Sequence, residues 1–503
     1  MLAAASALPL ASLAQMLQGC ASMVRTQELS GLGAADAVRH IAQGDLSAER
    51  YAAQLLANHH RHKRLNAIAW INEARLLEAA RALDLRRSGG ERLGPLGGLP
   101  VLVKDNVDTV GFPTSAGTPG LKANLPKRNA PVVEALLRSG ALLFGKANMH
   151  ELAAGGTSNN AAFGAVRNPY DPARVPGGSS GGTAAALAAR IVPAGIGTDT
   201  AGSVRIPAAF CGTVGFRPSL GAETKPYADA GVVPLSYDLD TVGPMARNVQ
   251  DVALLDAAIL GRPMPAPAPL RGARIGVPRQ LWEPLDAEVA RVCNAAIARL
   301  RDAGAVVVEI DLQGLIESSV QVFNSLVALG YVKHLGAFLV DHVPGVALEE
   351  VLARIASRDV KGFFQKMRSV QLPQPVADRL RNELRPGVVG RYEAVFQANQ
   401  LAAIAFPTVP VPAPSIRPGG DAGGERIQLA GEQVSETFTV IRNTKLAPVW
   451  RAPGLSIPAG LTAQGLPVGL ELDALSGRDA ELLALGMAAE KTMGAVPVPL
   501  LAG

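Results

Sequence analysis

Two short stretches rich in glycine and serine hold the residues best suited to nucleophilic chemistry. The first reads Gly-Gly-Ser-Ser-Gly-Gly over residues 177–182, and the second reads Asp-Thr-Ala-Gly-Ser over residues 199–203. Glycine permits backbone conformations that a Cβ would oppose, and successive N–H groups on a turn can bind an anion. Such a turn can form an oxyanion hole. The pattern indicates attack by a serine hydroxyl on a carbonyl carbon.

A short apolar run at residues 99–103 is followed by Lys104. The run predicts a buried strand, so the lysine is expected inside the protein at the end of that strand. Burial disfavours the ammonium form and can lower the pKa of a lysine by several units, and a neutral lysine is a competent base. The alternative is a surface ion pair of Lys104 with Asp105 or Asp108. The two serine stretches downstream favour the base.

Three motifs of this chain together resemble the signature of the amidase signature family of serine hydrolases. They are Val-Lys-Asp-Asn at 103–106, the glycine–serine run at 177–182, and Asp-Thr-Ala-Gly-Ser-Val-Arg-Ile-Pro at 199–207. The resemblance extends over roughly residues 29–490. It implies hydrolysis of a C–N amide bond through an acyl-enzyme.

The resemblance also implies a role for each polar side chain. Ser203 would be the nucleophile, and Ser179, at a non-proline cis peptide, would pass the proton of Ser203 to Lys104. The turn itself, apart from the resemblance, indicates that the N–H groups of Thr200, Ala201, Gly202 and Ser203 could bind the developing negative charge. The same relay, run backwards, would protonate the leaving nitrogen.

Three further residues of the motifs are expected to support the site. Asp199 and Arg205 would brace the serine turn, and an ordinary buried ion pair is the alternative for these two. Ser180 is expected to be structural, through hydrogen bonds of its hydroxyl.

Two other interpretations of the serines stay open. Gly177-x-Ser179-x-Gly181 satisfies the nucleophile-elbow pattern of α/β-hydrolases, which would make Ser179 the nucleophile of an esterase. That interpretation requires a late histidine, and the last two in the chain are His334 and His342. The other is the glutaminase-type subunit of a tRNA-dependent amidotransferase, which would release ammonia to a partner.

One histidine, His150, stands close to the motifs in sequence. It is expected to be structural or to line a cleft rather than to act as the base of a Ser-His-Asp triad.

The composition excludes several other classes. The formal charge is +5 and the basic residues are scattered, so nucleic acid is not expected as a partner. Cys20, Cys211 and Cys293 show no paired spacing, which argues against zinc and a disulfide framework. Gly-x-Gly at 195–197 lacks the third glycine of a dinucleotide site. We expect no cofactor and no metal, a small-molecule amide as the substrate, and leave a homodimer open.

The N-terminal segment, residues 1–28, is apolar and rich in alanine and leucine at its start. It is either a trimmed export signal or an N-terminal helix, so the chain could act in the cytoplasm or after export. No other stretch is expected to be long and apolar enough to cross a membrane.

The rest of the chain alternates helical and strand patterns, which predicts an α/β fold. Strands are expected at 99–103, 141–145, 274–278 and 305–310, and helices at 131–138, 182–190, 248–260, 286–303 and from 479. The expected architecture is a single large α/β/α domain, residues 29–503, with a central mixed sheet flanked by helices. A mostly helical insertion is expected at about 313–400. The resemblance implies about eleven strands.

Weaker motifs indicate a branch of the family. His-Glu-Leu-Ala at 150–153, the stretch 355–361 and Pro-Gly-Leu-Ser-Ile-Pro-Ala-Gly at 453–460 look most like the mandelamide and indoleacetamide hydrolase branch. This implies a small aryl or arylalkyl carboxamide as the substrate. Residues 445–450 depart from that branch, so an anilide, an ester or a carbamate with an aryl group stays open.

Overall fold

The computed structural model describes residues 29–221, 225–370 and 372–501. The expected N-terminal apolar segment, with its choice between export signal and helix, lies outside the described residues.

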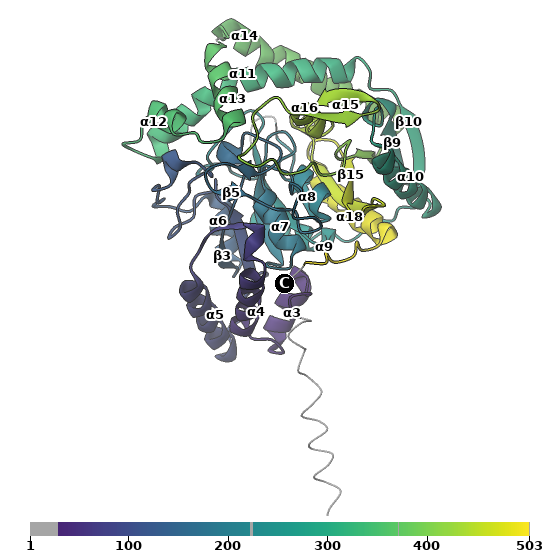
Figure 1. Cartoon of the computed structure of the whole chain (residues 1–503). Helices are drawn as coiled ribbons and strands as arrows, with labels where there is room; N and C mark the ends of the chain where they lie inside the picture. Colours follow the sequence, from purple (N-terminus) through teal and green to yellow (C-terminus); the bar gives the residue numbers. More distant parts are fainter. Residues whose placement is uncertain (1–28, 222–224, 371, 502–503) are drawn as a thin grey trace, which may run out of the picture.

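A mixed sheet of eleven strands runs through the molecule (Figure 1). In spatial order its strands are β1 (Ile68–Ile71), β3 (Leu142–Ala147), β2 (Pro100–Lys104), β6 (Ala194–Asp199), β8 (Thr241–Ala246), β7 (Val214–Arg217), β14 (Gly454–Leu461), β15 (Pro467–Asp473), β11 (Ala403–Pro407), β9 (Arg274–Pro278) and β10 (Val306–Ile310). Strand β2 is parallel to both of its neighbours, whereas β6, β8, β7, β14 and β15 pair antiparallel in succession. The predicted mixed sheet is confirmed.

Helices cover both faces of this sheet. One face carries α7 (Gly181–Ala188) and α8 (Arg205–Cys211), and the other carries α6 (Pro131–Arg138), α9 (Val249–Leu260), α10 (Ala287–Asp302) and α18 (Asp479–Met493). The side chains of β14, which point alternately to the two faces, show why helices pack on both. Leu455 and Ile457 point into an apolar core with α9, α10 and α18, while Ser456 between them points to the α8 face and contacts Thr408.

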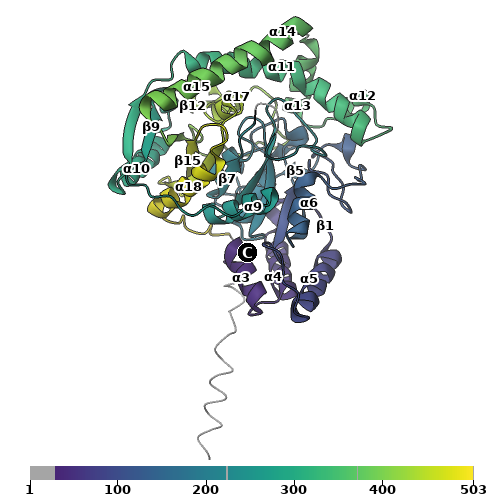
Figure 2. The ribbon, with the colours of Figure 1, turned by 180° about the vertical axis from the view of Figure 1, so that it is seen from behind.

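The insertion is helical, as predicted, and lies across one end of the molecule, opposite the N-terminal helices (Figures 1 and 2). Its helices are α11 (Leu315–His342), α12 (Leu348–Ala353), α13 (Arg358–Ser369), α14 (Gln374–Arg379) and α15 (Arg385–Asn399). The N-terminal helices are α3 (Ala34–Gln43), α4 (Ala48–Arg61) and α5 (Glu73–Ser88). The fold also has short elements, among them α16 (Glu436–Val440), α17 (Leu446–Trp450), β12 (Arg426–Leu429), β13 (Glu432–Ser435), β4 (Asn159–Asn160) and β5 (Gly164–Ala165).

Helix α11 corrects one expectation about membrane spans. It has 28 residues, and its most apolar 18-residue window has a mean hydropathy of 1.3, so by length and composition it could cross a bilayer. The expectation that no stretch beyond the N-terminus meets these criteria is therefore wrong. In the fold, 56 % of that window is buried, against a core that includes Trp450 and Tyr392. This burial is typical of a core helix.

The parallel strands β2 and β6 deliver the motif residues to one place. Lys104 is the last residue of β2 and Asp199 the last of β6. Because the carboxyl ends of adjacent parallel strands meet at the same edge, the lysine and the serine turn that follows β6 are brought together.

Candidate active site

The side chain of Lys104 reaches two hydroxyl groups. Nζ lies 2.7 Å from Oγ of Ser179 and 2.7 Å from Oγ1 of Thr198, and both Lys104 and Ser179 are fully buried. Asn106 donates to the same threonine oxygen at 3.1 Å. Thr198 lies on β6, so two neighbouring strands hold the amine against Ser179.

The surroundings of Lys104 favour its neutral form. Burial lowers its pKa from 10.5 to about 7, against the opposing effect of Asp199 and Asp240. Within the described residues, no carboxylate lies within ion-pair distance of Nζ, whose neighbours are hydroxyl and carbonyl oxygens. A substantial fraction of the amine is therefore neutral at pH 7.

The two serine stretches meet directly. The N–H of Ser180 donates to the carbonyl oxygen of Ser203 at 3.1 Å, and the peptide bond between Gly178 and Ser179 is cis. Ser180 also exchanges hydrogen bonds of 3.3 Å with the N–H and carbonyl of Thr198 through its hydroxyl. The hydroxyl of Ser180 thus ties the glycine loop to β6.

The hydrogen bond expected between the hydroxyls of Ser203 and Ser179 is not formed in the described structure. Across the described parts of the chain, Oγ of Ser203 makes no hydrogen bond, and that of Ser179 bonds only to Lys104. Hydrogen bonds between catalytic groups are often long before the substrate arrives. The contact between Lys104 and Ser179 is formed, whereas the hydroxyl of Ser203 has no partner among the described residues.

The N–H groups of the serine turn divide into two sets. That of Gly202 donates to Oδ1 of Asp199 at 3.0 Å, so it is engaged, unlike the expectation that it binds an oxyanion. Those of Thr200, Ala201 and Ser203 have no acceptor among the described residues. Three donors are available to an anion at this turn.

Asp199 and Arg205 form a fully buried ion pair at 3.0 Å. Arg217 also donates to Asp199, at 3.0 Å, and Arg205 donates to Glu471 at 2.7 Å. Although burial alone would raise it, the two guanidinium groups hold the pKa of Asp199 well below its usual range. Asp199 is thus a permanent anion that accepts the N–H groups of Gly202 and of the residue after Ser203.

The motifs alone did not reveal the roles of Thr198, Arg217 and Glu471. Arg217 and Glu471 lie on β7 and β15, far from the motifs in sequence. Thr198 could have been found, because it precedes Asp199 on a strand that also bears a motif.

A cavity of about 430 Å³ opens above Ser203. Its floor is formed by Ser203, Gly178, Thr200 and Ala201 together with the segment 153–156. The other lining residues are mainly apolar and come from α11, α13 and the region of α16: Phe323, Asn324, Val327, Tyr331, Phe363, Lys366, Met367, Thr437, Phe438 and Ile441, with Leu235. Ser179 is not among the lining residues.

The two late histidines lie away from the serines. His334 accepts the N–H of Tyr237 at 3.1 Å, and His342 lies 3.6 Å from Asp108. Neither has a hydrogen bond to Ser179 within the described residues. Neither late histidine is therefore placed, within the described residues, as the base of a nucleophile elbow at Ser179.

His150, Asp359 and Asp421 each place one oxygen or nitrogen within 4.8 Å of the others, a spacing that could suit a metal ion. Both ring nitrogens of His150 are already used. Nδ1 accepts the N–H of Ser158 at 3.1 Å, and Nε2 lies 3.0 Å from Asp359. The cluster is therefore organised as a hydrogen-bond network.

A second buried lysine, Lys146, was not singled out by its sequence. It lies on β3, and its Nζ donates to the carbonyl oxygens of Val107 at 2.7 Å and Pro113 at 3.2 Å. Asp105 lies 3.6 Å away. Burial lowers the pKa of Lys146 to about 8, against the opposing effect of Asp105 and Asp108.

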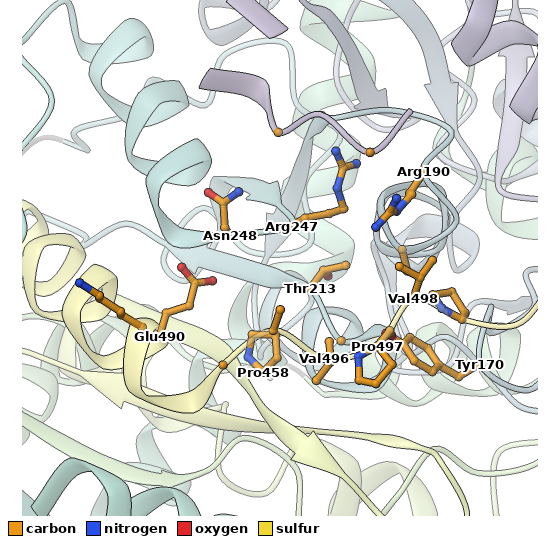
Figure 3. A pocket seen from close by; sticks show the side chains of 18 of the residues that line it. Tyr170, Arg190, Thr213, Arg247, Asn248, Pro458, Glu490, Val496, Pro497 and Val498 are labelled. Atoms are coloured by element: carbon orange, nitrogen blue, oxygen red, sulfur yellow. The ribbon is translucent and has the colours of Figure 1, made fainter. Parts of the chain in front are cut away.

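Another cavity, of about 500 Å³, lies between α9, α18 and the C-terminal tail (Figure 3). Arg190, Arg247, Thr213 and Glu490 are among the side chains around it, and burial raises the pKa of Glu490 to about 7. Neither candidate serine nor Lys104 lines it. Of the three candidate catalytic residues, Ser203 lines the cavity described above, and none lines this one.

Comparison with known proteins gives a consistent result. The family model described as Amidase matches residues 52–483. The chain is 38 % identical over 463 residues to an indoleacetamide hydrolase of Agrobacterium vitis, covering 91 % of this chain and 96 % of that protein. It is also 38 % identical over 459 residues to a mandelamide hydrolase of Pseudomonas putida, covering 87 % of each.

Among solved structures, the peptide amidase from Stenotrophomonas maltophilia superimposes with a TM-score of 0.78 at 28 % identity, covering 94 % of this chain and 99 % of that one. The family resemblance and the α/β fold expected from the motifs are both confirmed. The chain belongs to the amidase signature family and is an amide hydrolase.

Proposed function

We propose that this amidase cleaves small arylalkyl carboxamides through a Ser203–Ser179–Lys104 relay and an acyl-enzyme. The observation that carries the proposal is the contact of 2.7 Å between Nζ of Lys104 and Oγ of Ser179, in a fully buried setting that lowers the pKa of the amine to about 7. An amine that is partly neutral at pH 7 can take a proton from a hydroxyl.

The proton path follows from this contact. Neutral Lys104 accepts the proton of Ser179 as Ser179 takes the proton of Ser203, whose oxygen bonds to the carbonyl carbon of the amide. The proton returns through Ser179 to the nitrogen, the C–N bond breaks, and the amine leaves. Water then repeats the sequence on the ester of Ser203 and releases the carboxylic acid.

The negative charge that develops on the carbonyl oxygen has donors nearby. The unengaged N–H groups of Thr200, Ala201 and Ser203 lie on the turn that bears the nucleophile. Asp199 holds Gly202 in that turn, and Arg205 and Arg217 neutralise Asp199, so the turn is rigid before the substrate binds.

The walls of the cavity support an uncharged, apolar acyl group. No carboxylate lines the cavity within the described residues, and the single cation is Lys366. Aromatic side chains supply much of the remaining wall, and a volume of about 430 Å³ lies in the range usual for small-molecule sites. Glutamine would need partners for both of its charged groups, so the glutaminase alternative is less well supported.

The names of the relatives agree with this choice. Proteins at 38 % identity are called indoleacetamide hydrolase and mandelamide hydrolase, and both names denote amides of aryl-substituted acids. We therefore extend the proposal to primary amides of arylacetic acids. Esters and carbamates with an aryl group would use the same acyl-enzyme.

Release of ammonia and acid from a panel tests the proposal. The panel contains arylacetamides, aliphatic amides, glutamine, and the matching esters and carbamates. Arylacetamides should give the highest kcat/KM, and Ser203→Ala should abolish turnover while the thermal unfolding curve is retained. Ser179→Ala should be somewhat milder. Preference for glutamine, or wild-type kcat in the Ser203→Ala variant, would contradict the proposal.

A further inference from the structure

We propose that His150 and Asp359 are positioning residues that couple the α13 wall of the cavity to the backbone of Ser179. This inference rests on the proposed function, because it assigns to Ser179 a place in the proton path. Its readouts are the separate effects on KM and kcat for large and small amides.

On the serine side, His150 holds the carbonyl of Ser179 from two directions. Its own N–H donates to that carbonyl oxygen at 3.1 Å. Its Nδ1 accepts the N–H of Ser158 at 3.1 Å, and the hydroxyl of Ser158 donates to the same carbonyl at 3.4 Å. The N–H of Gly181 donates to that hydroxyl oxygen at 3.1 Å. The orientation of the ring thus sets the position of Ser158, and Ser158 holds the loop on both sides of Ser180.

The residues around His150 and Ser158 are closely packed. A Cβ added at Gly155, which lines the cavity, would lie 2.2 Å from Nε2 of His150. A Cβ added at Gly178 would lie 2.9 Å from the nitrogen of Ser158. The imidazole therefore packs directly beneath Gly155 of the cavity floor, and Gly178 of the serine loop packs against Ser158.

On the cavity side, the ring is held by the first turn of α13. Nε2 lies 3.0 Å from Oδ2 of Asp359, with the imidazole 1 % and the carboxylate 16 % exposed. The N–H of Ser158 points at Nδ1, so the proton of the neutral ring is on Nε2 and is donated to Asp359. Three carboxylates nearby raise the pKa of His150 overall, although burial lowers it.

A second pair of bonds joins the same two regions. The N–H of Asp359 donates to the carbonyl of Asp421 at 3.3 Å, and the hydroxyl of Thr157 donates to Oδ2 of Asp421 at 2.5 Å. Helix α13 itself carries Phe363, Lys366 and Met367 into the cavity wall. An acyl group that presses on these side chains acts on the helix that orients His150.

The two sides of the ring can be separated with a matched pair of variants. In His150→Asn, the side-chain oxygen can replace Nδ1 as the acceptor for Ser158, but the chain is too short to reach Asp359. In His150→Gln, the side-chain amide can reach Asp359 as Nε2 does, while the acceptor for Ser158 is lost. Both replacements are uncharged and polar.

The expected results differ for the two variants. His150→Gln should lower kcat about tenfold for phenylacetamide and for propionamide alike, because it loosens the serine loop for every substrate. His150→Asn should raise KM about tenfold for phenylacetamide, while KM and kcat for propionamide, too small to reach α13, stay within about twofold of wild type.

Asp359→Ala should reproduce the pattern of His150→Asn. The double variant that combines these two substitutions should raise KM for phenylacetamide no further than either single variant, because all three variants remove the same contact. Asp378→Ala is the control, since Asp378 is a carboxylate of the insertion whose side chain bonds only to Gln374 among the described residues. It should leave both substrates unchanged.

A merely structural role is distinguishable. If all His150 and Asp359 variants lower the unfolding temperature but keep wild-type kcat and KM, or if His150→Asn and Asp359→Ala affect the two substrates equally, the coupling is overturned. If the wild type hydrolyses neither amide, the proposed function fails, and labelling of Ser203 by a small and an aryl-bearing fluorophosphonate replaces the two amides. The size-dependent pattern must then appear in the labelling rates.

Discussion

Two lysines on adjacent strands, Lys104 and Lys146, show how the same side chain is used in two ways. In the parallel pairing of β2 with β3, Lys146 stands beside Val103 and Lys104 beside Ala147, so the two side chains leave opposite faces of the sheet. Both are completely buried. Their positions thus differ by one residue in register and by the partners they meet.

The hydrogen-bond partners of each lysine determine which charge state of its amine is favoured. Lys146 donates to two backbone carbonyls, which cannot donate in return, and to Thr114, and the carboxylate of Asp105 lies 3.6 Å from its Nζ, so this set favours the ammonium form. Lys104 meets two hydroxyls at 2.7 Å, and a hydroxyl can also donate to a neutral amine. Burial lowers the pKa of both amines, to about 8 in Lys146 and to about 7 in Lys104. Burial alone therefore does not make a base, because acceptors that cannot donate hold the charge in place.

The largest expected effect is on catalysis. Lys104→Met should lower kcat/KM for an arylacetamide by about 10³-fold or more, because the relay loses its base, while the fold is retained. Lys146→Met should keep kcat/KM within about threefold in the folded fraction. Steady-state kinetics on both variants measures this, and equal losses of activity would remove the distinction between the two lysines.

Stability should show the reverse order. Lys146→Met leaves the carbonyls of Val107 and Pro113 and the carboxylate of Asp105 without their buried donor, at a cost of about 3 kcal/mol. Lys104→Met removes a group whose charged form is disfavoured by burial, so its unfolding midpoint should change little. Denaturant unfolding compares the two, and a larger loss for Lys104→Met would contradict our interpretation.

The pH profile sharpens the comparison. Since the pKa of Lys104 is lowered from 10.5 to about 7, the neutral base is lost as the pH falls through 7. The value of kcat/KM should drop about tenfold per pH unit below that point and level off above it. We call this fall in kcat/KM below pH 7 the acid limb of the profile. Lys146→Arg, which keeps the charge, should retain the acid limb. A rate that peaks below pH 6 would argue against a neutral lysine.

The smallest effect concerns the hydroxyl partner of each amine. Thr198→Val removes an acceptor of the Lys104 ammonium, so the acid limb should move to lower pH and kcat should fall about tenfold. Thr114→Val removes the corresponding contact of Lys146, at 3.1 Å, and should leave the limb where it is. A shift in the second variant alone would assign the limb to Lys146.

The sequence was most informative where local pattern and chemistry coincide. The apolar run 99–103 predicted β2 and the burial of Lys104, and the helical insertion and the mixed sheet were also expected. The strand expected at 141–145 continues to Ala147, because its end is set by pairing with β1 and β2 rather than by its own residues. Lys146 was missed for that reason.

Partners far apart in the chain could not be predicted in this way. Arg205 finds Glu471 across 266 positions, and His150 finds Asp359 across 209. A single sequence shows neither pairing, because both depend on the packing of the sheet and the insertion. The engagement of the N–H of Gly202 by Asp199 is local, yet it depends on a side-chain orientation that the motif does not specify.

The most direct measurement follows covalent labelling of the serines by a fluorophosphonate as a function of pH, with peptide mapping, in the wild type and in Lys104→Met. We expect the label on Ser203 alone, a rate that rises through about pH 7, and labelling at least a hundredfold slower and insensitive to pH in the variant. A label on Ser179, or an unchanged rate without Lys104, would contradict the claim that a neutral lysine activates Ser203 through Ser179.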